Sequence, residues 1–114
     1  MNRAALLLAL LLPVQLFAAS GQPVIDGFLE PNGYVQITVL TTSVGLGTVP
    51  GLTKLVLIQC ESDNVRWRDD GTDPTTTVGM ILEAGQTLIY NGNPNEIEFI
   101  EVTVGAILNV SYYK

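Results

Sequence analysis

An alternation of apolar and polar residues with a period of two is the feature that most constrains this chain. From Gly33 onward, short segments rich in β-branched and aromatic residues are bounded by Gly, Pro, Asn and Asp. This pattern is typical of β-strands joined by turns. Beyond the N-terminus, no stretch keeps the 3.6-residue apolar period of an amphipathic helix for long. The sequence therefore predicts an all-β domain.

Two apolar segments predict further strands. The nearly continuous apolar run at 53–60, "TKLVLIQC", predicts a central strand that is buried on both faces. The closing segment 107–113, "ILNVSYY", places Leu108, Val110 and Tyr112 on one face, because successive side chains of a strand point to opposite sides.

A hairpin is expected between these two segments. The strand at 86–90, "QTLIY", is followed by "NGNPN" at 91–95, whose residues favour a turn, and then by "EIEFIEV" at 96–102. Ile97 and Phe99 have one parity, whereas the apolar residues after Phe99 have the other. This change predicts a β-bulge near Phe99.

The expected architecture is a compact antiparallel β-sandwich, jelly-roll-like or a small barrel, spanning residues 34–114. Six or seven short strands within about 80 residues favour this class. Residues 21–33 are rich in Pro and Gly, which suits a linker or an extended arm.

The first twenty residues form an apolar N-terminal segment with three possible interpretations. Arg3 precedes an apolar run over 4–12, and Ala18, Ala19 and Ser20 offer a cleavage point for a secretory signal peptide. The segment is also compatible with a retained anchor or assembly arm, or with a start codon assigned upstream of the true domain. Membrane contact is expected only through residues 1–20, if they are retained.

Charge and residue usage exclude several functions. The formal net charge of -6 and the pI of about 4.2 argue against nucleic-acid binding, which needs clustered Lys and Arg. The chain has no histidine and a single cysteine, Cys60, so the usual general base and the usual zinc ligands are missing. We expect no enzymatic activity, no metal and no cofactor, and we expect Cys60 to be a small buried hydrophobic residue.

The stretch "VRWRDDGTDP" at 65–74 is the most distinctive in the chain. Its three aspartates could suggest a calcium loop, but their spacing is not that of an EF-hand. A turn is favoured, with Arg66 or Arg68 paired to an aspartate and with Trp67 anchored in the core. The residues assigned to this structural turn and anchor are Arg66, Trp67, Arg68, Asp69, Asp70, Gly71 and Pro74.

The order of segments resembles that of small all-β virion accessory proteins of tailed bacteriophages, such as head-decoration and head-fibre-like proteins. The resemblance covers residues 53–114 and lies in these successive segments: "LVLIQCES", "VRWRDDGTDPTTTVGMIL", "AGQTLIYNG", "IEFIEV" and "AILNVSYY". It implies a non-enzymatic virion subunit that forms homo-oligomers and contacts other virion structural proteins.

The apolar N-terminus departs from this resemblance, because virion proteins assembled in the cytoplasm need no secretory signal. The alternative is a secreted or periplasmic bacterial β-sandwich that binds a protein or a surface glycan after signal cleavage.

Overall fold

The computed structural model describes residues 28–114, and the N-terminal segment 1–20 and residues 21–27 of the expected arm lie outside the described residues. The described part of the chain contains strands and no helix, so it offers no helix able to cross a membrane. The prediction of an all-β domain is confirmed for these residues. The strands are β2 (Pro31–Ile37), β3 (Val44–Gly45), β4 (Leu55–Glu61), β5 (Val65–Arg68), β6 (Met80–Leu82), β7 (Thr87–Tyr90), β8 (Glu98–Glu101) and β9 (Ile107–Tyr113).

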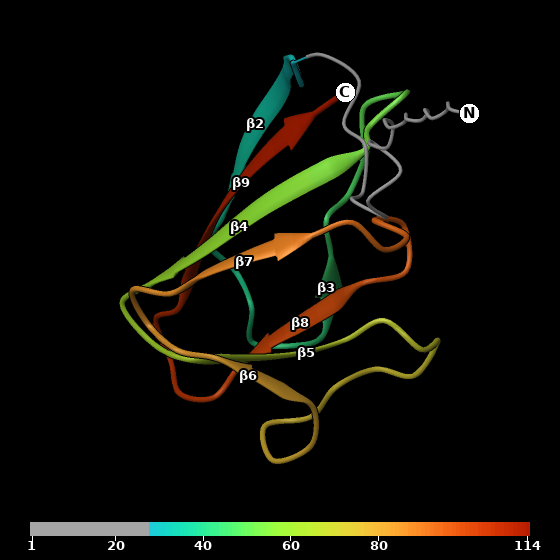
Figure 1. Ribbon diagram of the computed structural model, residues 1–114. Helices are drawn as coiled ribbons and strands as arrows, with labels where there is room; N and C mark the ends of the chain where they lie inside the picture. Colours follow the sequence, from blue (N-terminus) through green and yellow to red (C-terminus); the bar gives the residue numbers. More distant parts are fainter. Residues whose placement is uncertain (1–27) are drawn as a thin grey trace, which may run out of the picture.

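These strands form two four-stranded antiparallel sheets (Figure 1). One sheet has the order β2-β9-β4-β7 and the other has the order β3-β8-β5-β6. The eight strands exceed the six or seven expected, and β3, with only two residues, is the shortest of them.

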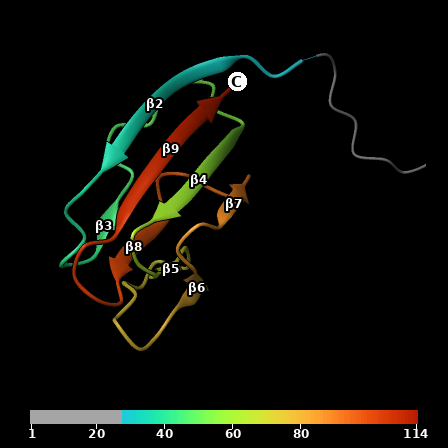
Figure 2. The same ribbon diagram turned by 90° about the vertical axis from the view of Figure 1, so that its left-hand side faces the viewer.

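Strands far apart in the sequence are neighbours in space. β2 pairs with β9, β3 with β8, β4 with β7, and β5 with β6. Two further pairings, β4 with β9 and β5 with β8, join these pairs into the two sheets. Figure 2 shows β2, β9 and β4 running side by side, with the C-terminus close to the start of β2. Strand β2 begins at Pro31, within the stretch expected as an arm, and its register shifts between Pro31 and Gly33.

One hydrophobic core takes side chains from both sheets. Leu108, Val110 and Tyr112 of β9 are all buried, as their parity predicted. From the other sheet, Val65 and Phe99 are completely buried in the same cluster. Burial of a large aliphatic or aromatic side chain contributes about 1.5–3 kcal/mol, so these shared contacts are what hold the two sheets together.

The central position of β4 is confirmed, but its burial on both faces is not. Val56, Ile58 and Cys60 are buried, whereas Gln59 and Glu61 are exposed. The reason is that no described element covers the outer face of this sheet. Cys60 is a buried small residue as predicted, and its burial raises the pKa of the thiol to about 11.

The expected hairpin between 86–90 and 96–102 is wrong. β7 pairs with β4 in one sheet, and β8 pairs with β5 and β3 in the other. The connection between them crosses from sheet to sheet, and Ile97 at its end is completely buried in the core. Turn-forming residues therefore mark this connection correctly but do not determine which strand follows as a partner.

The expected bulge near Phe99 is also wrong. The register of β8 against β5 runs without a shift from Glu98 to Glu101. Phe99 and Glu101 both face inward, and Glu101 is only 7% exposed. A carboxylate oxygen of Glu101 accepts a hydrogen bond from the backbone N–H of Gly105 at 3.1 Å. A polar residue thus occupies a core position, which the apolar pattern could not indicate.

Candidate functional site

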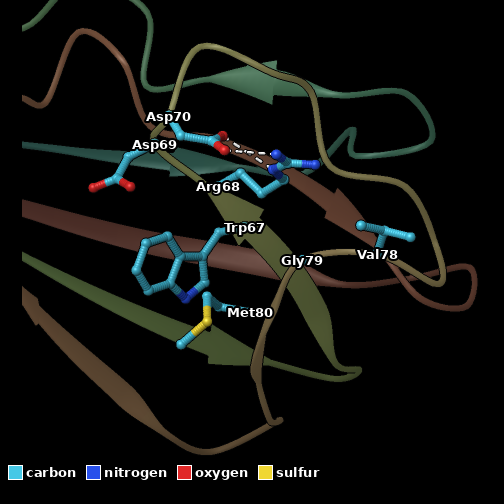
Figure 3. Close-up of a pocket in the computed structure, with 7 residues that line it drawn as sticks. All are labelled: Trp67, Arg68, Asp69, Asp70, Val78, Gly79 and Met80. Atoms are coloured by element: carbon cyan, nitrogen blue, oxygen red, sulfur yellow. Dashed lines mark hydrogen bonds and ion pairs between the residues drawn. The ribbon is translucent and has the colours of Figure 1, made fainter.

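The distinctive stretch forms the end of β5 and the long loop that leads to β6. This loop and the two strands surround an open hollow of about 530 Å³. Figure 3 shows Arg68 and Asp70 joined on one side of the Trp67 ring, with the side chain of Met80 on the other. The residues that line the hollow are Trp67, Arg68, Asp69, Asp70, Val78, Gly79 and Met80.

Arg68 and Asp70 form the ion pair expected at the start of the loop. The guanidinium donates through Nε to Oδ1 at 3.0 Å and through Nη2 to Oδ2 at 2.6 Å. The hydrogen bond from Arg68 lowers the pKa of the Asp70 carboxyl. Arg68 is half-buried and Asp70 is exposed, so solvent screens the pair and it fixes local geometry more than it stabilises the fold.

Arg66 holds the far side of the loop instead of pairing with an aspartate. Its Nη1 donates to the carbonyl oxygen of Gly79 at 2.8 Å, and its Nε donates to that of Thr76 at 3.1 Å. Within the loop, the Thr75 hydroxyl oxygen accepts from the N–H of Val78 at 3.0 Å. The loop is therefore fixed by bonds of its own and of the strand that precedes it.

Tyr90 ties the loop to the opposite sheet. Its hydroxyl donates to Oδ2 of Asp69 at 2.9 Å and lies 3.1 Å from the carbonyl oxygen of Asn93. Its ring meets Trp67 edge-on, with the centroids 6.1 Å apart and the planes at 75°. Burial, reinforced by Asp69, raises the pKa of Tyr90 to about 12. Because Trp67 lies on β5 and Tyr90 on β7, this contact links the two sheets.

Two glycines and a proline shape the loop. Gly71 has a φ of +85°, a conformation that other residues rarely adopt. Gly79 has a φ of +141°, and a Cβ there would lie 3.1 Å from Cβ of Arg66 and 3.2 Å from Cβ of Pro74. Pro74 is buried beneath the loop. The backbone conformation of the loop between β5 and β6 thus depends on Gly71, Gly79 and Pro74.

The aspartates do not converge on one point. Asp69 is bonded to Tyr90, whereas Asp70 is bonded to Arg68. Among residues 28–114, no group of three or more His, Cys, Asp or Glu side chains is placed to hold a metal ion. The hollow is mainly apolar, and its chemistry suits the docking of an apolar side chain.

Sequence reasoning missed a second surface, on the outer face of the β2-β9-β4-β7 sheet. Oδ1 of Asn109 accepts from the Tyr34 hydroxyl at 2.7 Å and from Nε2 of Gln36 at 2.9 Å. Its Nδ2 donates to Oε1 of Gln59 at 3.4 Å and to a carboxylate oxygen of Glu61. The only signal in the sequence is that Asn109 lies between two core residues and so must face outward.

Replacing Gly71 tests the path of the loop. Gly71→Val should lower the free energy of unfolding by about 1–3 kcal/mol, because a β-branched residue is strained at positive φ. Gly51→Val is the matched control, since Gly51 also has open space around it but no positive φ. Urea denaturation of both variants measures the effect, and equal losses would contradict the assignment of the strain to Gly71.

Tyr90→Phe tests the link between the sheets through its dependence on pH. The pKa of Tyr90 is about 12 when folded against 10.0 for an ordinary tyrosine, so folding favours the protonated form. The resulting stability is fully present below pH 10 and is lost as the pH rises through 12. The variant should lose about 1 kcal/mol at pH 7, the contribution of one hydrogen bond.

Above pH 10 the stability of the variant should fall less steeply than that of the wild type, because the variant lacks the Tyr90 hydroxyl. Some fall remains in both proteins, since both keep Cys60 and Tyr112, whose pKa values are also raised. Unfolding free energies measured at several pH values provide the comparison. Identical slopes for the two proteins would show that folding does not raise the pKa of Tyr90.

No protein-family model, no curated protein and no solved structure matches the chain.

Proposed function

We propose that this chain is a non-enzymatic structural subunit of a phage or prophage particle, a virion accessory that decorates the capsid or supports a fibre through protein–protein contacts. The strand pairing is the observation that carries the proposal. Among the described residues, β2 pairs with β9, β3 with β8, β4 with β7 and β5 with β6.

This nesting is that of one long antiparallel ribbon whose successive pairs lie alternately in the two sheets. Such a ribbon, wound into a sandwich of eight strands, is a jelly roll, the architecture of many viral capsid domains, lectins and cupins. A cupin-type metalloenzyme would require imidazole ligands, and the chain has no histidine. The remaining uses of the architecture are assembly and binding.

The long loop also supports a role in contacts. It is held by hydrogen bonds of the Arg66, Arg68 and Tyr90 side chains. A surface that is already ordered loses little conformational entropy on association. Val78 at the end of the loop and Met80 at the start of β6 are exposed, which suits an interface better than a catalytic centre.

The second candidate function is that of a secreted or periplasmic module that binds a surface glycan. The Asn109 network favours it, because it places an exposed tyrosine ring beside amide groups and a carboxylate on one sheet face. An aromatic ring can stack on a sugar face, and amides and carboxylates can hydrogen-bond to sugar hydroxyls. Tyr34 is 63% exposed, so its ring is free to stack on a sugar face.

Labelling of intact particles distinguishes the two functions. Antibodies to the chain should decorate negatively stained particles released by the phage or prophage that encodes it. Mass spectrometry of those particles should detect this protein after they have been purified on a density gradient. Unlabelled particles, together with a secreted protein that starts at Ser20 or Gly21 and binds a glycan array, would replace the virion function with the second one.

A further inference from the structure

We infer that the Asn91–Gly92 pair is a site of spontaneous covalent modification, at which the Asn91 side chain loses its amide and the backbone becomes an isoaspartyl link. The pair lies in the connection that crosses from β7 to β8 (Figure 1). The substrate of the reaction is the chain itself, and the co-reactant is water. The inference goes beyond the proposed function and does not depend on it.

The chemistry joins the side chain of an asparagine to the backbone of the next residue. The backbone nitrogen of Gly92 attacks Cγ of Asn91 and closes a cyclic imide, while Nδ2 leaves as ammonia with the proton that the nitrogen gives up. Water then opens the ring. Cleavage at Cγ leaves an aspartate, whereas cleavage at the main-chain carbonyl carbon leaves an isoaspartyl link, whose backbone runs through Cβ and Cγ. A glycine favours ring closure, because it has no Cβ to hinder the attacking nitrogen.

The fold leaves both reacting groups of this pair free. Asn91 and Gly92 are exposed, so water has access to the ring. Neither belongs to a strand, since β7 ends at Tyr90 and β8 begins at Glu98. Within residues 28–114, no hydrogen bond holds the Asn91 amide or the N–H of Gly92. The two groups can therefore move into the geometry of the ring without first breaking a hydrogen bond.

The chain contains one other Asn-Gly pair, Asn32–Gly33, and the fold protects it. Nδ2 of Asn32 donates to the carbonyl oxygen of Gly51 at 3.0 Å and to Oγ1 of Thr53 at 3.3 Å. Both residues of the pair lie in β2, whose extended backbone pairs with β9. Ring closure bends the backbone out of the extended conformation, so β2 must open locally before Asn32 can react.

An Asp-Gly pair can close the same ring, but the pair at Asp70–Gly71 is also held. The Asp70 carboxylate accepts two hydrogen bonds from Arg68, at 3.0 Å and 2.6 Å. Arg68 also lowers the pKa of Asp70 and so keeps it ionised, and a carboxylate is a poor target for a nucleophile. Of these pairs among residues 28–114, only Asn91–Gly92 is therefore left unprotected.

Tyr90 makes the modification consequential for the fold. Gly92 lies so close to Tyr90 that a Cβ on it would be 2.6 Å from Cζ of the ring. The Tyr90 hydroxyl bonds to Asp69 and to the carbonyl oxygen of Asn93. The isoaspartyl link adds a carbon to the backbone just before Gly92, which shifts Gly92 and Asn93 relative to the ring. The modification should therefore loosen the contact that links the two sheets.

Ageing of the purified full chain at mildly alkaline pH tests the inference. Mass spectrometry after proteolysis follows the loss of each amide, and an isoaspartate methyltransferase detects the isoaspartyl link. Asn91 should react at least about tenfold faster than Asn32, because local opening of β2 must precede the reaction at Asn32. In urea that unfolds the chain, the two sites should react at similar rates. Equal rates in the folded protein, or a faster reaction at Asn32, would overturn the inference.

Two variants complete the test. Asn91→Gln keeps an amide but must close a larger ring, so it should give no isoaspartyl signal at this position. A signal that persists in this variant would place the reaction elsewhere in the chain and overturn the inference. Asn91→Asp carries the new charge without the extra backbone carbon, so aged protein enriched in the isoaspartyl link should unfold at a lower urea concentration than this variant. Equal midpoints would contradict the effect on Tyr90.

Discussion

The pairing of strands from opposite ends of the chain is the constraint on which the rest of the structure depends. β9 lies between β2 and β4, so the C-terminal strand completes the sheet that β2 begins. Bringing together strands that are far apart in the sequence costs conformational entropy, and the hydrogen bonds of local turns do not offset this cost. The buried faces of β9 and β4 offset this cost, because Leu108, Val110 and Ile58 leave water completely.

The contact between the two sheets through β5 and β7 is more specific than the core. Trp67 and Tyr90 meet edge-on, and Asp69 fixes the hydroxyl of Tyr90. A core of aliphatic side chains tolerates small rearrangements, whereas a hydrogen bond and an aromatic contact require one geometry. The long loop therefore does two things: it links the sheets and it presents the apolar edge beside it.

The local pattern predicted what depends on local physics. Alternation identified the inward faces of β9, and the turn predicted within 65–74 is present, with Gly71 at a positive φ. Pairing was not predictable in this way, because the turn residues after Tyr90 suit a hairpin as well as a crossing between sheets. The bulge predicted near Phe99 failed for a different reason. Glu101 is a charged residue that faces the core, and its carboxylate is satisfied by a hydrogen bond from the loop after β8, which the sequence pattern does not place beside it.

The most direct test of the account is the set of nuclear Overhauser contacts between backbone protons of the labelled protein. The account predicts contacts from β9 to both β2 and β4 and from β5 to β8. It predicts none between Thr87–Tyr90 and Glu98–Glu101, which lie in different sheets. A ladder of contacts between those two segments would restore the simple hairpin and contradict the nested pairing.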